Sequence, residues 1–458
     1  MYGLKLLRAA LPAVLMACGS GSSGPGDVAA PCREQPDAAR AEQIALLRDR
    51  VLRIIDGSPC PGADCQMTTF QTTPAAATTA SEGARVLLID EAIITVAATR
   101  YQSRTLAFLR RDAEGFYLPG ELEIWLAADA LRVFQAVDRF PGPLASEEIE
   151  VATAFVRKFG NVIPNWTGHG MDILPFLEDR MPRAQFVVSE ALLDVPLGEA
   201  SICGVIDAGT REAALQRLET QLGNTRQSLS RVIEQYAINY VHLSWGITAA
   251  QIEQLVQSRC GAAPPREVVD RIQRDYLDLL EALARLSVMV AGRPQPVLMF
   301  QAATGSPGVL KPNDPDFITD CTPFAGRLRV HVAAYTGTDI PIGGSSDPRF
   351  MTQAAQRALA CLDVVVNVGY SGPFDVRAAP AYFPTTSLGL GAFPPEWPAE
   401  SSFANPVGLA YFAYLSDQHP GETQAQLVDR VTHQDSKPVV DPLLFAQFPR
   451  PSQRVCTR

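Results

Sequence analysis

The sequence lacks any apolar run of the roughly 18–20 residues that a membrane-spanning helix needs, which argues against a polytopic membrane protein. It also lacks a cluster of Lys and Arg. Its 39 basic residues stand against 49 acidic ones, a net charge of −10, so duplex nucleic acid is not an expected partner. No internal repeat with a period of about 20–50 residues is visible. With 47% hydrophobic and 19% charged residues, the chain is typical of a folded protein.

Histidine is scarce, and its spacing excludes the common zinc motifs. The five histidines form neither H-x-x-x-H nor H-E-x-x-H. One acidic segment, which contains Asn313, Asp314 and Asp316, has oxygen ligands suited to calcium but lacks the EF-hand spacing. A solvated acidic loop is the other interpretation. We therefore predict no metal site and no cofactor, with calcium as the one open alternative.

The first residues have the layout of an export signal. Lys5 and Arg8 precede a short apolar run, Ala9–Ala17, that is too short to span a bilayer. The segment Leu15–Cys18 resembles the bacterial lipobox, in which the cysteine is lipidated and becomes the mature N-terminus. An ordinary signal peptide with a chance cysteine is the alternative. We predict a signal peptide over 1–17, a lipid on Cys18 and a flexible Gly/Ser tether over 18–35. The protein would then be a membrane-anchored lipoprotein of the cell envelope, on its periplasmic or outer-surface side.

The remaining cysteines favour disulfides. Nine cysteines become eight once Cys18 is assigned to the lipid, and an even number in an exported chain favours paired thiols. Cys60 and Cys65 are close in sequence, but they do not form C-x-x-C and have no histidine nearby, which argues against a metal knuckle. The sequence leaves the pairing open.

Three further regions follow the tether. Residues 36–83 contain a helix that Asp37 caps and that ends at Gly57, a cysteine-containing loop, and a Thr/Ala-rich linker over 68–81. Residues 84–433 form the main domain, and residues 434–458 form an extended, proline-rich tail.

The main domain alternates between buried-strand and helical patterns. Strand-like segments are predicted at 85–93, 184–189, 237–243, 297–303 and 364–368, and helical ones at 171–179, 211–235, 267–286 and 353–362. This alternation indicates βαβ units. We predict an α/β fold with a mostly parallel central sheet and helices on both faces.

Three residues of this domain carry reactive side chains at a strand end or a helix start, positions where catalytic groups are often found. Asp90 ends a buried strand, at the sheet edge where active sites gather; a plain strand-end acid is the alternative. His169 stands between two glycines before an amphipathic helix, where a simple helix-start histidine is an even alternative. Ser402 opens a helix of small apolar residues. A serine there is usually a cap, but the helix dipole also favours negative charge on a nucleophile. Pro406 fits the first turn, where its missing N–H costs little.

Together these segments resemble the subtilisin-like serine proteases (subtilases), whose triad runs Asp, His, Ser along the chain. Ser402–Pro406 follows the Ser-x-Ala-x-Pro part of the family's serine motif, and Gly168–Gly170 matches its histidine box. Ala237–Gly246 is similar to the strand that ends in Ser-x-Gly, and Val364–Gly369 to a later strand. The resemblance covers roughly residues 84–433.

The resemblance implies roles for these residues. Ser402 would attack a peptide carbonyl, His169 would move the proton, and Asp90 would hold the imidazole. The backbone of Ser244, Trp245 and Gly246 would pair with an extended peptide. No nucleic acid is implied as a partner.

The sequence also departs from the family pattern. Glu91-Ala92 follows the aspartate and Glu400-Ser401 precedes the serine, in place of the usual small residues. The oxyanion asparagine is missing, and Thr304 and Gly305 occupy that stretch. Because all three triad residue types are present in the family's order, the sequence still predicts a lipid-anchored serine endopeptidase. The alternatives are a catalytically weak or dead subtilase-fold lipoprotein that binds a peptide or protein, and an unrelated α/β binding lipoprotein.

Overall fold

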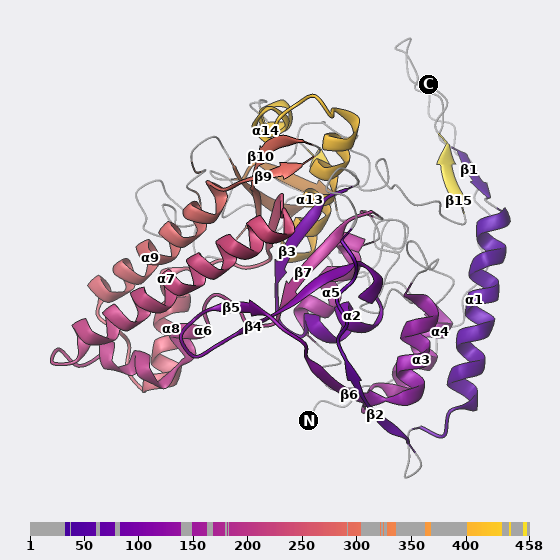
Figure 1. The fold of residues 1–458 in the computed structure, drawn as a ribbon, viewed down its shortest axis with the longest axis horizontal. Helices are drawn as coiled ribbons and strands as arrows, with labels where there is room; N and C mark the ends of the chain where they lie inside the picture. Colours follow the sequence, from indigo (N-terminus) through magenta and orange to yellow (C-terminus); the bar gives the residue numbers. More distant parts are fainter. Residues whose placement is uncertain are drawn as a thin grey trace, which may run out of the picture.

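A computed structural model (Figure 1) describes residues 33–36, 38–60, 65–77, 83–138, 149–162, 168–178, 183–290, 292–303, 328–335, 362–367, 401–432, 439–440 and 452–455, together with the single residues 181, 321 and 324.

The centre of the molecule is a nine-stranded sheet in the order β14-β13-β12-β11-β8-β3-β7-β4-β5. All neighbouring strands are parallel except β4 and β5. This confirms the predicted α/β fold with its mostly parallel sheet. The strands are β3 (Arg85–Ile89), β4 (Thr105–Arg111), β5 (Tyr117–Pro119), β7 (Gln185–Ser189), β8 (Tyr240–Leu243), β11 (Leu298–Ala302), β12 (Arg329–Tyr335), β13 (Val364–Asn367) and β14 (Val439–Val440).

Helices cover both faces of this sheet, which is why its central strands are mostly apolar, and every residue of β3 is buried. On one face lie α2 (Ile93–Thr99), α5 (His169–Glu178) and α13 (Ser401–Gln418), where the ring of Phe300 lies 5.2 Å from that of Phe412. Its neighbour Gln301 points to the other face, into a pocket with Tyr276 of α9. That face carries α7 (Arg211–Tyr236) and α9 (Arg266–Ala284), which lie side by side (Figure 1).

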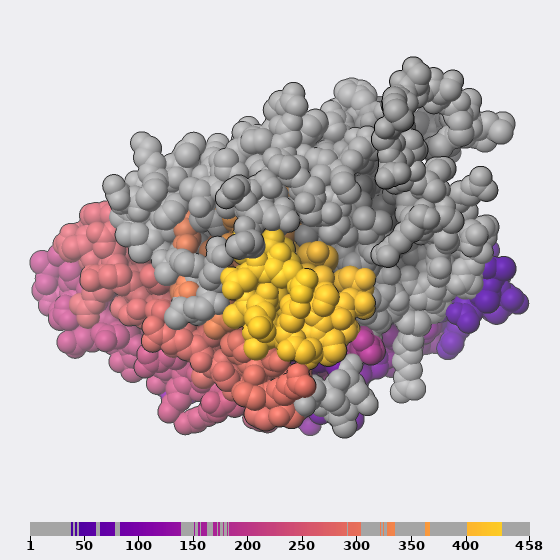
Figure 2. All heavy atoms as spheres, turned by 90° about the horizontal axis from the view of Figure 1, so that it is seen from above, coloured from indigo at the N-terminus to yellow at the C-terminus, as the bar shows by residue number. Residues whose placement is uncertain are grey.

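The other elements surround this core. They are α1 (Ala38–Gly57), α3 (Ala128–Val137), α4 (Ile149–Phe159), α6 (Val195–Gly198), α8 (Ala249–Cys260), α14 (Gln424–Thr432), two 3₁₀ turns, η1 (Gln102–Arg104) and η3 (Ala200–Val205), and the strand pairs β1 (Arg33–Pro36) with β15 (Ser452–Val455), β2 (Met67–Gln71) with β6 (Glu123–Ala127), and β9 (Ser287–Val290) with β10 (Arg293–Pro296). Figure 2 shows α13 and α14 in yellow beside the β9–β10 hairpin, which Arg293 ties to Pro420 O. Among the helices of the described segments, none combines the length and apolar character needed to cross a bilayer.

Three segments differ from the sequence prediction. Val439–Val440 of the predicted tail form β14, which pairs with β13 in the central sheet. Part of the predicted linker is a strand, β2, because its backbone pairs with β6 over 50 residues away. The strand predicted from Arg85 to Ile93 ends at Ile89, and the chain turns at Asp90–Ala92 into α2, with Ala92 in the left-handed region at φ 53°. The helix predicted at 353–362 falls almost wholly outside the described residues.

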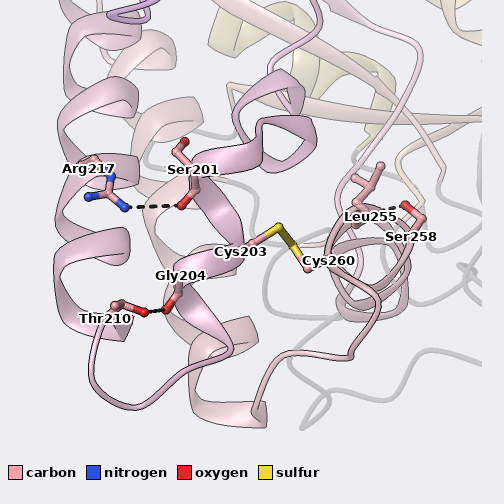
Figure 3. The surroundings of a disulfide bond; sticks show 8 residues. All are labelled: Ser201, Cys203, Gly204, Thr210, Arg217, Leu255, Ser258 and Cys260. Carbon is pink, nitrogen blue, oxygen red and sulfur yellow. Dashed lines mark hydrogen bonds between the residues drawn. A yellow bond between two sulfur atoms is a disulfide. The ribbon is translucent and has the colours of Figure 1, made fainter.

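Two disulfides connect described cysteines. Cys60 pairs with Cys65, and Cys203 pairs with Cys260 across 57 residues. The second bond joins η3 to the end of α8. Within η3, Gly204 O also accepts a hydrogen bond from the Thr210 hydroxyl over 2.8 Å (Figure 3). Cys321 is disulfide-bonded as well.

Candidate active site

Asp90 follows β3 at the carboxyl edge of the sheet and is only 2% exposed. Its N–H donates to Ser189 O of β7 over 2.9 Å, and its carboxylate accepts from the N–H of Glu91 over 2.8 Å. Burial raises the pKa of Asp90, while the hydrogen bonds with His169 and the Glu91 N–H act in the opposite direction.

His169 is the first residue of α5, and its Nδ1 lies 2.9 Å from both carboxylate oxygens of Asp90. A buried carboxylate on Nδ1 favours the tautomer that carries its proton there, so Nε2 is the nitrogen able to accept a proton. The side chain is 28% exposed, so the imidazole is reachable from solvent. This pair is the structural core of the candidate site.

The glycines around His169 allow this approach. A Cβ on Gly170 would lie 2.5 Å from Glu91 O, and one on Gly168 would lie 2.2 Å from the Cβ of Ala92. The Gly170 N–H donates to Glu91 O over 2.9 Å, and the His169 N–H donates to the Glu91 carboxylate over 3.3 Å. The start of α5 is therefore fastened to the turn that carries Asp90.

Ser402 lies in the first turn of α13, which packs against α5. It is partly exposed, and the ring centroid of the next residue, Phe403, lies 5.7 Å from that of His169. Asn405 fastens this turn to the sheet: its side-chain amide donates to Leu243 O over 2.9 Å and to Phe300 O over 3.4 Å. The serine-bearing turn is thus fixed over β8 and β11, next to the imidazole.

The segment Ser244–Gly246 leaves β8 beside this turn. Leu243 is the last residue of β8 that pairs with a neighbouring strand, so the backbone at Trp245 and Gly246 runs beyond the ladder. The Ser244 hydroxyl donates to Ser402 O over 3.2 Å, and the Trp245 indole N–H donates to Ile89 O over 3.5 Å. The structure therefore gathers Asp90, His169, Ser402 and this segment at one edge of the sheet.

The other sequence candidates lie beyond the described residues: Thr304, Gly305, Cys18 and the acidic segment with Asp314. Gln301, the long side chain nearest the oxyanion stretch, points to the opposite face of the sheet, where its Oε1 accepts from Arg329 Nε over 2.9 Å. Within the described segments, no three or more His, Cys, Asp or Glu side chains gather in a way that suits a metal ion.

One residue of the site had no role in the sequence interpretation. His242 of β8 is completely buried, and its Nε2 lies 3.2 Å from the Ser244 hydroxyl oxygen. Burial, together with the charge of His169, lowers the pKa of His242 to about 3. The available signal was strand alternation, because a side chain two residues before Ser244 shares its face.

No protein-family model and no curated protein matches the sequence. Among solved structures, a cold adapted subtilisin-like serine proteinase is 10% identical with a TM-score of 0.32, over 80% of this chain and 91% of that chain. The MycP3 protease from the type VII (ESX-3) secretion system is 12% identical with a TM-score of 0.34, over 86% and 97%.

Proposed function

We propose that the protein is a serine endopeptidase with Asp90, His169 and Ser402 as its triad. The observation that carries the proposal is the buried Asp90 carboxylate on Nδ1 of His169, beside the helix turn that bears Ser402. A buried acid that orients an imidazole next to a serine at a helix start is the arrangement that nucleophilic acyl transfer requires.

The reaction would follow from this geometry. His169 Nε2 removes the proton of the Ser402 hydroxyl as its oxygen attacks the peptide carbonyl carbon, and it then donates that proton to the leaving amine. Asp90 remains ionised and stabilises the imidazolium. The N-terminus of α13 favours the negative charge on the tetrahedral intermediate, and the Ser402 N–H is one expected donor to it.

The substrate would be an extended peptide. The backbone of Ser244, Trp245 and Gly246 lies past the last ladder pair of β8, and its N–H and C=O groups are the candidates to pair with a peptide added as a short strand. Thr304 and Gly305 are the candidates for the second oxyanion donor. Loss of an asparagine donor costs roughly 100- to 1,000-fold in turnover in such enzymes, so we expect weak hydrolysis.

A fluorophosphonate probe tests the nucleophile. We expect labelling of the wild-type protein, none of Ser402→Ala, and slow labelling of Asp90→Asn and His169→Ala. Ser401→Ala is the matched control, because its buried hydroxyl lies one residue away. Labelling that survives Ser402→Ala, or a wild-type protein that never reacts, would contradict the proposal.

A non-catalytic peptide-binding protein is the second candidate. It is favoured by the missing asparagine and by Glu400, a negative charge two residues before the proposed nucleophile. A peptide that binds and is recovered intact, with no hydrolysis gained in Thr304→Asn or Gly305→Asn, would support this candidate.

We also propose that the protein is anchored in the cell envelope by a lipid on Cys18. The support is the sequence Leu15–Cys18 and the Gly/Ser spacer after it. Cys18→Ser should move the protein from the detergent phase to the aqueous phase in a phase-partition assay. An unchanged detergent-phase fraction would refute the anchor.

A further inference from the structure

A second histidine lies under the proposed nucleophile and takes no part in the triad. In the sheet register, His242 stands beside Phe300 of β11, which α13 covers, and beside Leu88 of β3. Its imidazole is completely buried on this face, and its Nδ1 has no hydrogen-bond partner among the residues that the structure describes. A buried imidazole this close to a catalytic centre calls for a physical reason, because burying a polar group is costly.

The reason begins with Pro406, which lies inside α13 and not, as the sequence predicted, in its first turn. In an α-helix, the carbonyl of Ser402 would accept a hydrogen bond from the N–H of residue 406, but proline has none, and its ring crowds that carbonyl. The Ser244 hydroxyl takes the place of the missing donor at 3.2 Å. Ser244 is itself only 7% exposed, so this bond is sheltered from water.

His242 completes the chain of hydrogen bonds. Because the Ser244 hydroxyl donates its proton to Ser402 O, the Ser244 oxygen is left to accept a hydrogen bond, and His242 Nε2 lies 3.2 Å from it. Nε2 therefore carries the imidazole proton and Nδ1 carries a lone pair. The opposite tautomer would bury an unpaired N–H, which is rarer in proteins than an unpaired acceptor.

We propose that neutral His242 is a positioning residue for the nucleophile: through the Ser244 hydroxyl it holds the Ser402 carbonyl, and with it the first turn of α13, at a fixed place beside His169. The inference rests on the proposed function where it concerns reaction rate. Its hydrogen-bond chain is a separate, structural claim.

The chain matters because Ser402 supplies both the attacking oxygen and a main-chain N–H to the oxyanion. A small displacement of that turn would misplace both groups at once. A neutral imidazole suits this position. A charged one would repel the imidazolium that forms on His169 during the reaction.

Substitutions of the two side chains in this chain of hydrogen bonds provide the kinetic test. We expect Ser244→Ala and His242→Leu each to lower kcat and the rate of fluorophosphonate labelling about tenfold, the factor that corresponds to one hydrogen bond of roughly 1.4 kcal/mol, with KM within about twofold. The double variant should lose no more than either single one, because both break the same chain. His242→Asn retains an N–H donor and should recover part of the rate. A kcat within about twofold of wild type in Ser244→Ala, or additive losses, would overturn the inference.

Nitrogen-15 spectra of the full-length protein, labelled at histidine, test the chain of hydrogen bonds independently of catalysis. We expect the His242 signals of a neutral imidazole protonated at Nε2, shifted in Ser244→Ala. If the wild-type protein is not labelled by the probe, the proposed function fails while this measurement still decides the hydrogen-bond chain. An Nδ1–H tautomer overturns it. Melting temperatures identify any variant that does not fold. If a His242 variant does not fold, Ser244→Ala, which removes only one oxygen atom, provides the kinetic test.

Discussion

The burial of neutral His242 predicts a particular loss of stability in acid. In the unfolded chain, this imidazole titrates near its ordinary value of 6.5, whereas in the folded protein its pKa is about 3. Between these values the unfolded state binds one more proton than the folded state. The free energy of unfolding therefore falls as the pH falls, by at most about 1.4 kcal/mol per pH unit. The contribution is fully present above pH 6.5 and is lost progressively towards pH 3.

From pH 6.5 to pH 4.5, His242 alone should lower the free energy of unfolding by about 2 kcal/mol. Carboxylates also titrate in this range, so the measurement is a difference. Urea unfolding at both pH values is compared between the wild-type protein and His242→Asn, which cannot take up this proton. The acid-induced loss should be smaller in His242→Asn by about 2 kcal/mol. Ser244→Ala, which leaves the imidazole in place, should behave like the wild type.

Equal acid-induced losses in the wild-type protein and His242→Asn would refute this reasoning. They would mean that His242 is reached by water or takes up a proton in the folded state. The cost of the substitution at neutral pH does not enter, because each protein is compared with itself at two pH values.

Three further predictions concern the scaffold of the site. Gly170→Ala should destabilise the protein by about 1–3 kcal/mol and disturb the Asp90–His169 pair. Gly223→Ala is the control, because a Cβ added at this position of α7 would meet nothing within 4 Å; it should be neutral or stabilising by up to about 1 kcal/mol. Urea unfolding checks both. Asn405→Ala should cost about 1–3 kcal/mol by the same assay, since it leaves the buried Leu243 carbonyl without its donor. Loss of the Cys203–Cys260 bond, which closes a 57-residue loop, should lower stability by roughly 4 kcal/mol in the chain-entropy account, and loss of Cys60–Cys65 by only about 2; the reverse order of melting temperatures would contradict that account.

Local patterns were enough to predict the central strands and helices. After Arg85 the β3 segment is apolar at every position, which is typical of a strand covered on both faces. The sequence also predicts α7 and α9 to within one or two residues at either end. The pattern failed where pairing is not local. The β2 segment is rich in Thr and reads as a linker, yet β6 provides it with a hydrogen-bonding partner.

The candidate site divides in the same way. Residue types and their order along the chain were sufficient to nominate Asp90, His169 and Ser402, because each stands at a strand end or helix start that the local pattern reveals. The chain of hydrogen bonds from His242 through Ser244 to Ser402 is invisible in the sequence. It joins β8 to a helix turn 158 residues later, and only tertiary packing brings the Ser244 hydroxyl to the carbonyl that Pro406 leaves without a donor. A hydrogen bond depends on tenths of an ångström between atoms, and no local pattern sets that distance.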